Sequence, residues 1–138
     1  MTKLSNRERM LAAGLEVVHA HGYAGASVRD IVSAAGVPQG SFTNHFACKE
    51  EFVLEILDLY VAAGRELMAS TLLNETLSPL QRLSDYLDAN QNRLDANQMR
   101  NGCLFGNFSA EATDHSEPIR ARLVEIFAEL QQIGRAHV

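Results

Sequence analysis

The stretch over residues 27–46 constrains the fold of this 138-residue chain more than any other part of the sequence. A short segment over 28–34 has apolar residues at helical spacing and runs into Gly36. Pro38 then opens a second short segment, over about 38–44. Two short helices joined by a tight, glycine-containing turn are typical of a helix-turn-helix, whose second helix can lie in the major groove of DNA.

Capping residues predict where the first helices begin. Ser5 is followed three residues later by Glu8, and Ser27 is followed at the same spacing by Asp30. Each pair forms a capping box, in which each side chain satisfies a backbone amide that the helix leaves unpaired. The apolar periodicity after Ser5 predicts a helix over about 6–21, ahead of the two short helices.

The apolar spacing stays helical through the rest of the chain. It predicts a long helix over about 49–72, a helix that begins at Ser78 and Pro79, a buried helix within 102–112, and a last helix after Pro118. The expected apolar face of the helix that begins at Pro79 consists of Leu80, Leu83, Leu87 and Leu94. Because no β-hairpin or βαβ pattern is present, we expect an all-α fold.

The distribution of charge permits DNA binding by the N-terminal part. The formal net charge is −5, which by itself is a mild argument against nucleic-acid binding. Residues 1–50 carry five basic and four acidic side chains, whereas residues 51–138 carry seven basic and thirteen acidic ones. The acidic excess therefore lies away from the predicted helix-turn-helix.

Several functional classes have no support in the sequence. No apolar run approaches the roughly 20 residues of a membrane span, so we expect a soluble, cytoplasmic protein that contacts no membrane. No nucleophile–base motif, P-loop or dinucleotide fingerprint is present, and we expect neither an enzyme nor a cofactor. We expect no metal site, because the histidines considered as ligands lack ligand spacing. They are His19, His21, His115 and His137.

Residues 27–52 carry a resemblance to a known family. The run S-V-R-D-I-V-S-A-A-G-V-P-Q-G-S-F-T-N-H-F-A-C-K-E-E-F resembles the DNA-binding signature of the TetR family of transcriptional repressors. The similarity begins near Arg7, covers the first four predicted helices, and continues more loosely in G-C-L-F-G-N-F-S-A-E, residues 102–111. It implies a helix-turn-helix DNA-binding domain over 1–48 and a helical effector-binding and dimerisation domain over 49–138, joined by the long helix.

The resemblance also implies a function. Members of the family are homodimeric repressors that bind a near-palindromic operator in double-stranded DNA and are released by a small-molecule effector. The family usually continues with two more helices, so we expect this chain to be shortened at its C terminus, with the tail from Ile133 outside the fold. The alternative is a ligand- or partner-binding helical protein that has lost productive DNA binding.

The expected DNA contacts lie near the start of the second short helix. Candidates for contacts with base edges are polar residues at positions where major-groove readers act, namely Gln39, Ser41 and Asn44. Gly40 would let the backbone approach DNA closely. Candidates for phosphate contacts are Ser27, Arg29, Thr43, His45 and Lys49. For His45, a role in helix packing remains an alternative.

Two residues depart from the family pattern at the backbone-contacting end of this stretch. Thr43 replaces a tyrosine that usually contacts the DNA backbone, and its hydroxyl has a shorter reach. Cys48 replaces a serine that usually caps the long helix, and a thiol is a poor acceptor. We therefore expect intact base preference and weaker phosphate anchoring, with a soft start to the long helix.

The apolar residues of the last helices line a ligand pocket or fill a core, and one sequence does not separate the two uses. The candidates for a ligand-binding role are Cys103, Phe105, Phe108, Ile119, Leu123 and Phe127. The resemblance includes regulators that sense electrophiles or oxidants through a cysteine, and the start of a helix near Cys103 would raise the reactivity of its thiol. The alternative for Cys103 is a small, buried apolar residue.

Overall fold

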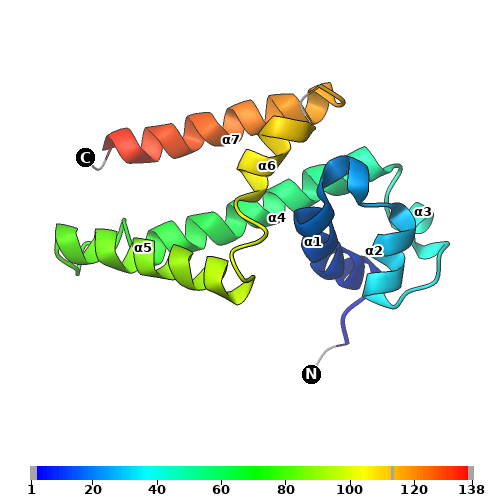
Figure 1. Ribbon diagram of the computed structural model, residues 1–138, viewed down its shortest axis with the longest axis horizontal. Helices are drawn as coiled ribbons and strands as arrows, with labels where there is room; N and C mark the ends of the chain where they lie inside the picture. Colours follow the sequence, from blue (N-terminus) through cyan, green and yellow to red (C-terminus); the bar gives the residue numbers. More distant parts are fainter. Residues whose placement is uncertain (1–2, 113, 137–138) are drawn as a thin grey trace.

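A computed structural model describes residues 3–112 and 114–136, and these residues form seven helices and no strand (Figure 1). The helices are α1 (Asn6–Gly25), α2 (Val28–Ala35), α3 (Ser41–His45), α4 (Lys49–Ser70), α5 (Pro79–Ala96), α6 (Leu104–Glu111) and α7 (Glu117–Ala136). The predicted all-α fold is confirmed. Figure 1 shows α1, α2 and α3 grouped at one end of α4, which extends away from them between α5 and α7.

The N-terminal head consists of α1, α2, α3 and the first half of α4 around one core. Three aromatic rings lie at its centre: the Phe46 and Phe52 centroids are 4.9 Å apart, and each lies 5.4 Å from that of Phe42. All three side chains are at most 2% exposed. A helix of five residues such as α3 is not stable alone, so its position depends on these contacts.

Helices α1 and α4 are in tight contact at Gly14. A Cβ atom at this position would lie 2.3 Å from Cζ of Phe52, well inside van der Waals contact. Glycine is therefore required at residue 14 by the space that Phe52 occupies. The contact fixes how α4 crosses the head.

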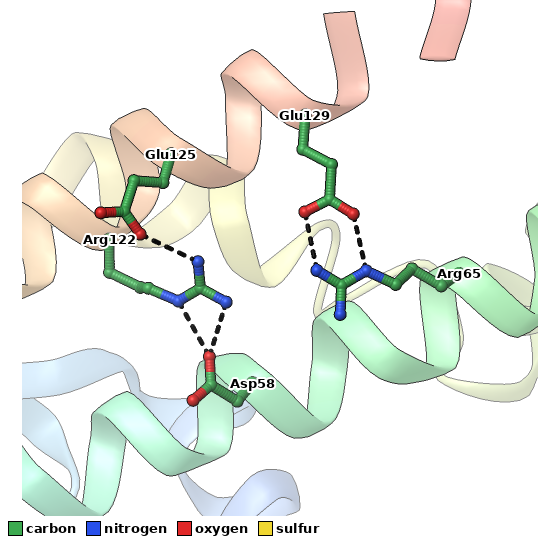
Figure 2. Close-up of polar contacts among 5 residues, drawn as sticks. All are labelled: Asp58, Arg65, Arg122, Glu125 and Glu129. Atoms are coloured by element: carbon green, nitrogen blue, oxygen red, sulfur yellow. Dashed lines mark hydrogen bonds and ion pairs between the residues drawn. The ribbon is translucent and has the colours of Figure 1, made fainter. Parts of the chain in front are cut away.

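Two ion-pair clusters join α4 to α7 (Figure 2). Arg65 donates from Nε and Nη2 to the two carboxylate oxygens of Glu129, at 2.6 and 2.7 Å. Arg122 lies 2.8 Å from Asp58 Oδ1 and 3.1 Å from Glu125 Oε2. The hydrogen bonds from Arg65 hold the pKa of Glu129 below its ordinary value. Helix α7 also contributes three buried apolar residues, Ile119, Leu123 and Ile126.

Helix α5 differs from its prediction. Leu80, Leu83 and Leu87 are 78%, 48% and 57% exposed, and the helix has no buried residue. The predicted apolar face of α5 therefore lies exposed over these three leucines. The more protected side of α5 instead includes residues with polar groups, such as Tyr86 and Asn90.

The predicted helix starts are confirmed at three N-caps and wrong at one. Ser5 and Ser27 form the expected capping boxes, and Ser78 accepts a hydrogen bond from the amide of residue 81. Pro38 does not begin a helix, because Pro38–Gly40 is a turn in which the Ser41 amide donates to the Pro38 carbonyl at 2.9 Å. As expected, the Cys48 side chain makes no capping hydrogen bond.

Two helices extend further than predicted. Helix α1 continues beyond residue 21 to Gly25 through a non-helical residue, Gly22, whose φ is 75° and ψ is −175°. Helix α7 continues through Ile133 to Ala136. The expectation that the chain leaves the fold at Ile133 is therefore wrong over the described residues.

The contact at Gly14 generates a stability prediction. Gly14→Ala forces a methyl group into the Phe52 ring, so we expect the free energy of unfolding to fall by about 1–3 kcal/mol. Gly64→Ala is the matched control, because it lies within α4 and a Cβ there meets no atom within 4 Å. We expect this control to stabilise the chain by about 0.5–1 kcal/mol through helix propensity. Urea denaturation measures both changes, and equal effects would contradict the proposed packing.

Candidate nucleic-acid interface and the adjoining cavity

A capping box fixes the start of α2. The Ser27 hydroxyl accepts from the Asp30 amide at 3.1 Å and donates to Asp30 Oδ2 at 2.6 Å. These hydrogen bonds lower the pKa of Asp30 from its ordinary value, the side-chain bond from Ser27 being the larger cause. Because both functions of the hydroxyl are used, a phosphate contact by Ser27 would compete with the cap.

The turn between α2 and α3 is held from both sides. Gly36 is in the left-handed region, with φ 62° and ψ 40°, and its amide donates to the Ser33 carbonyl. Arg9 Nη2 on α1 donates to the Gly36 carbonyl at 3.0 Å. Glycine accepts a positive φ without strain, so this position and Arg9 together set the angle at which α3 leaves the turn.

Most of the predicted DNA-contacting residues lie on the exposed side of the turn and α3. The exposed members there are Gln39, Gly40, Thr43, Asn44 and His45, and Ser27 and Arg29 are exposed at the start of α2. The exposure of His45 removes the alternative of a buried packing residue. Ser41 is only 7% exposed, and its hydroxyl accepts from Asn6 Nδ2 at 3.4 Å. This burial counts against the predicted base contact by Ser41.

The side chains of Thr43 and Lys49 make contacts within the chain. The Thr43 hydroxyl donates to the Gly40 carbonyl at 3.1 Å. Lys49 Nζ donates to the carbonyls of Tyr23 and Ala26, at 2.7 and 3.2 Å, and lies 4.6 Å from the Tyr23 ring centroid. Because an ammonium group has three donors, Lys49 retains one N–H for a phosphate.

The C-terminal segment of α1, residues 22–26, is also bound by α6. Glu111 accepts from the amides of Tyr23 and Ala24, at 3.0 and 2.8 Å. A Cβ at Gly22 would lie 2.3 Å from Oε2 of Glu111, so the carboxylate fits only against glycine. Lys49 and Glu111 therefore hold opposite polar groups of one segment, which leads directly into α2.

A cavity of about 510 Å³ is lined by residues of α1, α4, α5, α6 and α7. Of the six predicted ligand-binding residues, Cys103 and Phe105 line it. Phe108, Ile119 and Leu123 are at most 2% exposed, whereas Phe127 is 43% exposed; none of the four lines the cavity. Three of the predicted residues are therefore core residues.

Cys103 occupies the N-cap position of α6, and its side chain makes no capping hydrogen bond. The residue is exposed. This exposure contradicts the alternative of a small, buried apolar residue. A sensing role for the thiol stays a prediction.

The polar contacts of the cavity were not predicted from the sequence. Arg93 on α5 donates from Nη1 to the Tyr60 hydroxyl on α4 at 2.5 Å, and His19 Nε2 on α1 donates to the Gly102 carbonyl at 3.0 Å. These partners are separated by 33 and 83 residues in the chain. None of these residues belongs to a local sequence motif. Only a prediction of how α1, α4 and α5 pack together could have identified these contacts.

The described residues contain neither a cluster suited to a metal ion nor a helix suited to span a membrane. Over 3–112 and 114–136, no group of three or more histidine, cysteine, aspartate or glutamate side chains is placed to hold a metal ion. His137 lies outside the described residues. In the same ranges, none of the helices has both the length and the apolar character needed to cross a membrane.

Two family models match the chain. One, described as "Bacterial regulatory proteins, tetR family", matches residues 10–56. The other, described as "Tetracyclin repressor-like, C-terminal domain", matches residues 79–138. The matches cover the head with the first part of α4, and the segment from α5 onward.

Individual proteins are similar over most of the chain. The HTH-type transcriptional repressor DhaR of Mycobacterium sp. (strain GP1) is 37% identical over 127 residues, which are 92% of this chain and 62% of DhaR. The crystal structure of regulatory protein TetR from Rhodobacter sphaeroides has a TM-score of 0.86 and 30% identity, covering 93% of this chain and 68% of that one. Reduced Escherichia coli NemR has a TM-score of 0.76 and 28% identity, over 88% and 63%. The chain thus spans less than two thirds of DhaR.

The geometry at Thr43 generates a prediction about DNA affinity. Thr43→Tyr places a longer hydroxyl-bearing side chain on the exposed side of α3, within reach of a phosphate. We expect affinity to rise about 10- to 100-fold, the range for one hydrogen bond to a charged group, and to rise alike on all DNA sequences. Fluorescence anisotropy with two unrelated duplexes measures this, with Thr43→Phe as the control for the hydroxyl. A gain confined to one base position would contradict a phosphate contact.

Proposed function

Because the chain belongs to the TetR family of transcriptional regulators, we propose that it is a repressor that binds a DNA operator and is released by a small molecule in the cavity beside α6. The observation that carries this proposal is the exposed polar face of the turn and α3, held at a fixed angle by Gly36, Arg9 and the aromatic core. A helix held in this way can enter the major groove as a rigid unit.

Gln39 and Asn44 are the proposed readers of base edges, since both are exposed and their amides can form paired hydrogen bonds with adenine. Arg29, Thr43 and His45 are the proposed phosphate contacts, with Lys49 contributing its remaining N–H. Ser41 is left out of the set because of its burial. The interface thus has a small number of charges, in keeping with an operator affinity that depends moderately on salt.

We propose a homodimer as the DNA-binding form. A near-palindromic operator presents half-sites about 34–36 Å apart, so two heads at that spacing bind together. The exposed leucines of α5, with Val124 and Phe127 on α7, support a further covered surface in the assembly. Analytical ultracentrifugation measures the assembly. A strict monomer without sequence preference would instead support a helical ligand-binding protein that does not bind DNA productively.

The proposed release passes through α6, which has contacts with the cavity and with the head. Cys103 and Phe105 at one end line the cavity, and Glu111 at the other end binds the segment 22–26. That segment is directly followed by Ser27, the cap of α2. A ligand that displaces α6 would therefore move the start of the helix-turn-helix, which opposes the half-site spacing that the operator requires.

The assigned contacts are tested on an operator selected from a random duplex library. We expect Asn44→Ala and Gln39→Ala each to cost about 1–3 kcal/mol and to relax preference at one base position. Arg29→Ala should weaken binding on all sequences and reduce the salt slope by about 1. Arg100→Ala, an exposed arginine between α5 and α6, is the control. Loss of sequence preference in Arg29→Ala alone would contradict these assignments.

The coupling through Glu111 is tested separately. Glu111→Gln replaces a carboxylate that accepts two amide hydrogen bonds, so the Tyr23 and Ala24 amides should exchange faster with solvent. We expect the effect of any releasing molecule found by screening the unmodified protein to shrink by about 0.5–2 kcal/mol, the usual range for residues that couple sites. Glu66→Gln, an exposed carboxylate on α4, is the control. Full release in Glu111→Gln, with both amides unprotected, would refute this route.

A further inference from the structure

The cavity beside α6 combines mainly apolar walls with one arginine. Its apolar surface comes from all the helices that surround it and consists of Leu15, Ala63, Leu67, Met68, Leu94, Phe105 and Leu130. Its only charged side chains among the described residues are Glu16 and Arg93. Its volume of about 510 Å³ is in the range of cavities that hold small organic molecules.

The charge of Arg93 is not neutralised by a carboxylate. Its guanidinium donates to the Tyr60 hydroxyl at 2.5 Å and to Asn90 Oδ1 at 3.3 Å, and both partners are neutral. Within 3–112 and 114–136, Arg93 has no ion pair, whereas Arg7, Arg65 and Arg120 each have one and Arg122 has two. Arg93 therefore presents an unpaired positive charge with further N–H donors at the cavity wall.

Tyr60 supplies a second donor beside this charge. Its ring is packed edge to face on Phe105, with centroids 4.8 Å apart, and on His19 at 5.6 Å, so its direction is fixed. Burial is the main cause that raises the pKa of Tyr60. The hydroxyl therefore keeps its proton at neutral pH, accepts from Arg93, and has its own O–H to donate.

We propose that this cavity binds a small organic monoanion, a carboxylate with an apolar body, whose oxygens accept from the Arg93 guanidinium and the Tyr60 hydroxyl. A planar guanidinium matches the two oxygens of a carboxylate. One cation balances one negative charge, and the apolar walls bury the remainder of the molecule. A cationic ligand would face Arg93 and find only Glu16 in compensation.

If the proposed function holds, this carboxylate is the effector, and this one consequence rests on the proposed function. Arg93 is on α5, Tyr60 on α4, and Cys103 at the start of α6 lines the same cavity. An anion that accepts from both Arg93 and Tyr60 lies between a side chain of α5 and a side chain of α4. Its binding thereby changes the contact between α4 and α5.

Isothermal titration calorimetry on the 138-residue chain tests the site without DNA. The probes are benzoate and hexanoate, each with its uncharged amide, benzamide or hexanamide, as a control of nearly equal shape. We expect both acids to bind about 10- to 100-fold more tightly than their amides, the range for hydrogen bonds to a charged group. Inorganic phosphate, which lacks an apolar body, should bind more weakly than either acid.

Variants assign the binding to the named residues. Arg93→Gln should reduce the affinity for each acid to that for its amide, and Tyr60→Phe should reduce it about 3- to 10-fold. Arg100→Gln removes an exposed arginine that does not line the cavity and should leave the affinity unchanged. Circular dichroism melting curves confirm that each variant is folded before titration.

The outcomes separate this site from the proposed function. Equal binding of acids and amides, phosphate binding as tight as the acids, acid binding that survives Arg93→Gln, or no binding by either acid would overturn the proposal. Anisotropy with the selected operator is measured in parallel. Acid binding that depends on Arg93 but leaves operator affinity unchanged would retain the site and refute the effector role. Operator release by an uncharged molecule alone would support release by a small molecule and refute the carboxylate as the effector.

Discussion

The burial of Phe52 between α1 and α4 is the contact on which the rest of the molecule depends. Its ring fills the space opposite Gly14 and packs against Phe42 and Phe46, the two aromatic side chains of the α3 region. Helices as short as α2 and α3 have no stability of their own, so they take their positions from this cluster. Since α4 also forms a wall of the cavity through Tyr60, the same helix positions both the N-terminal head and the cavity.

The segment 22–26 is bound both by α4 and by α6. Lys49, at the start of α4, binds its carbonyl groups, and Glu111, at the end of α6, binds its amides. A hydrogen bond between a backbone group and a charged side chain is stronger than a neutral one, so its loss costs more free energy. A displacement of either helix is therefore transmitted to the segment that positions α2, without any change in the aromatic core.

Local chemistry predicted much of the head, and long-range packing accounts for the rest. The capping boxes at Ser5 and Ser27, the left-handed Gly36 and the uncapped Cys48 depend on neighbours within a few residues, so the sequence contains their full cause. The start of α3 was predicted too early because proline suits a turn as well as a first helical position. The buried Ser41 hydroxyl accepts from Asn6, 35 residues away, and the contact of Tyr60 with Arg93 depends on how α4 meets α5. No spacing rule contains such pairs.

The ion pairs between α4 and α7 decide which parts of the cavity wall can move. Asp58 and Arg65 on α4 are seven residues apart and have opposite charge, and their partners Arg122 and Glu129 on α7 repeat that spacing with the signs reversed (Figure 2). Sliding either helix by that distance brings like charges together, so the pairs fix the register even though each exposed pair adds little stability. Helix α5 has no such tie and no buried residue. Elements with few buried contacts move at the lowest free energy, so we expect an occupant of the cavity to displace α5 and its Arg93 before it displaces α7.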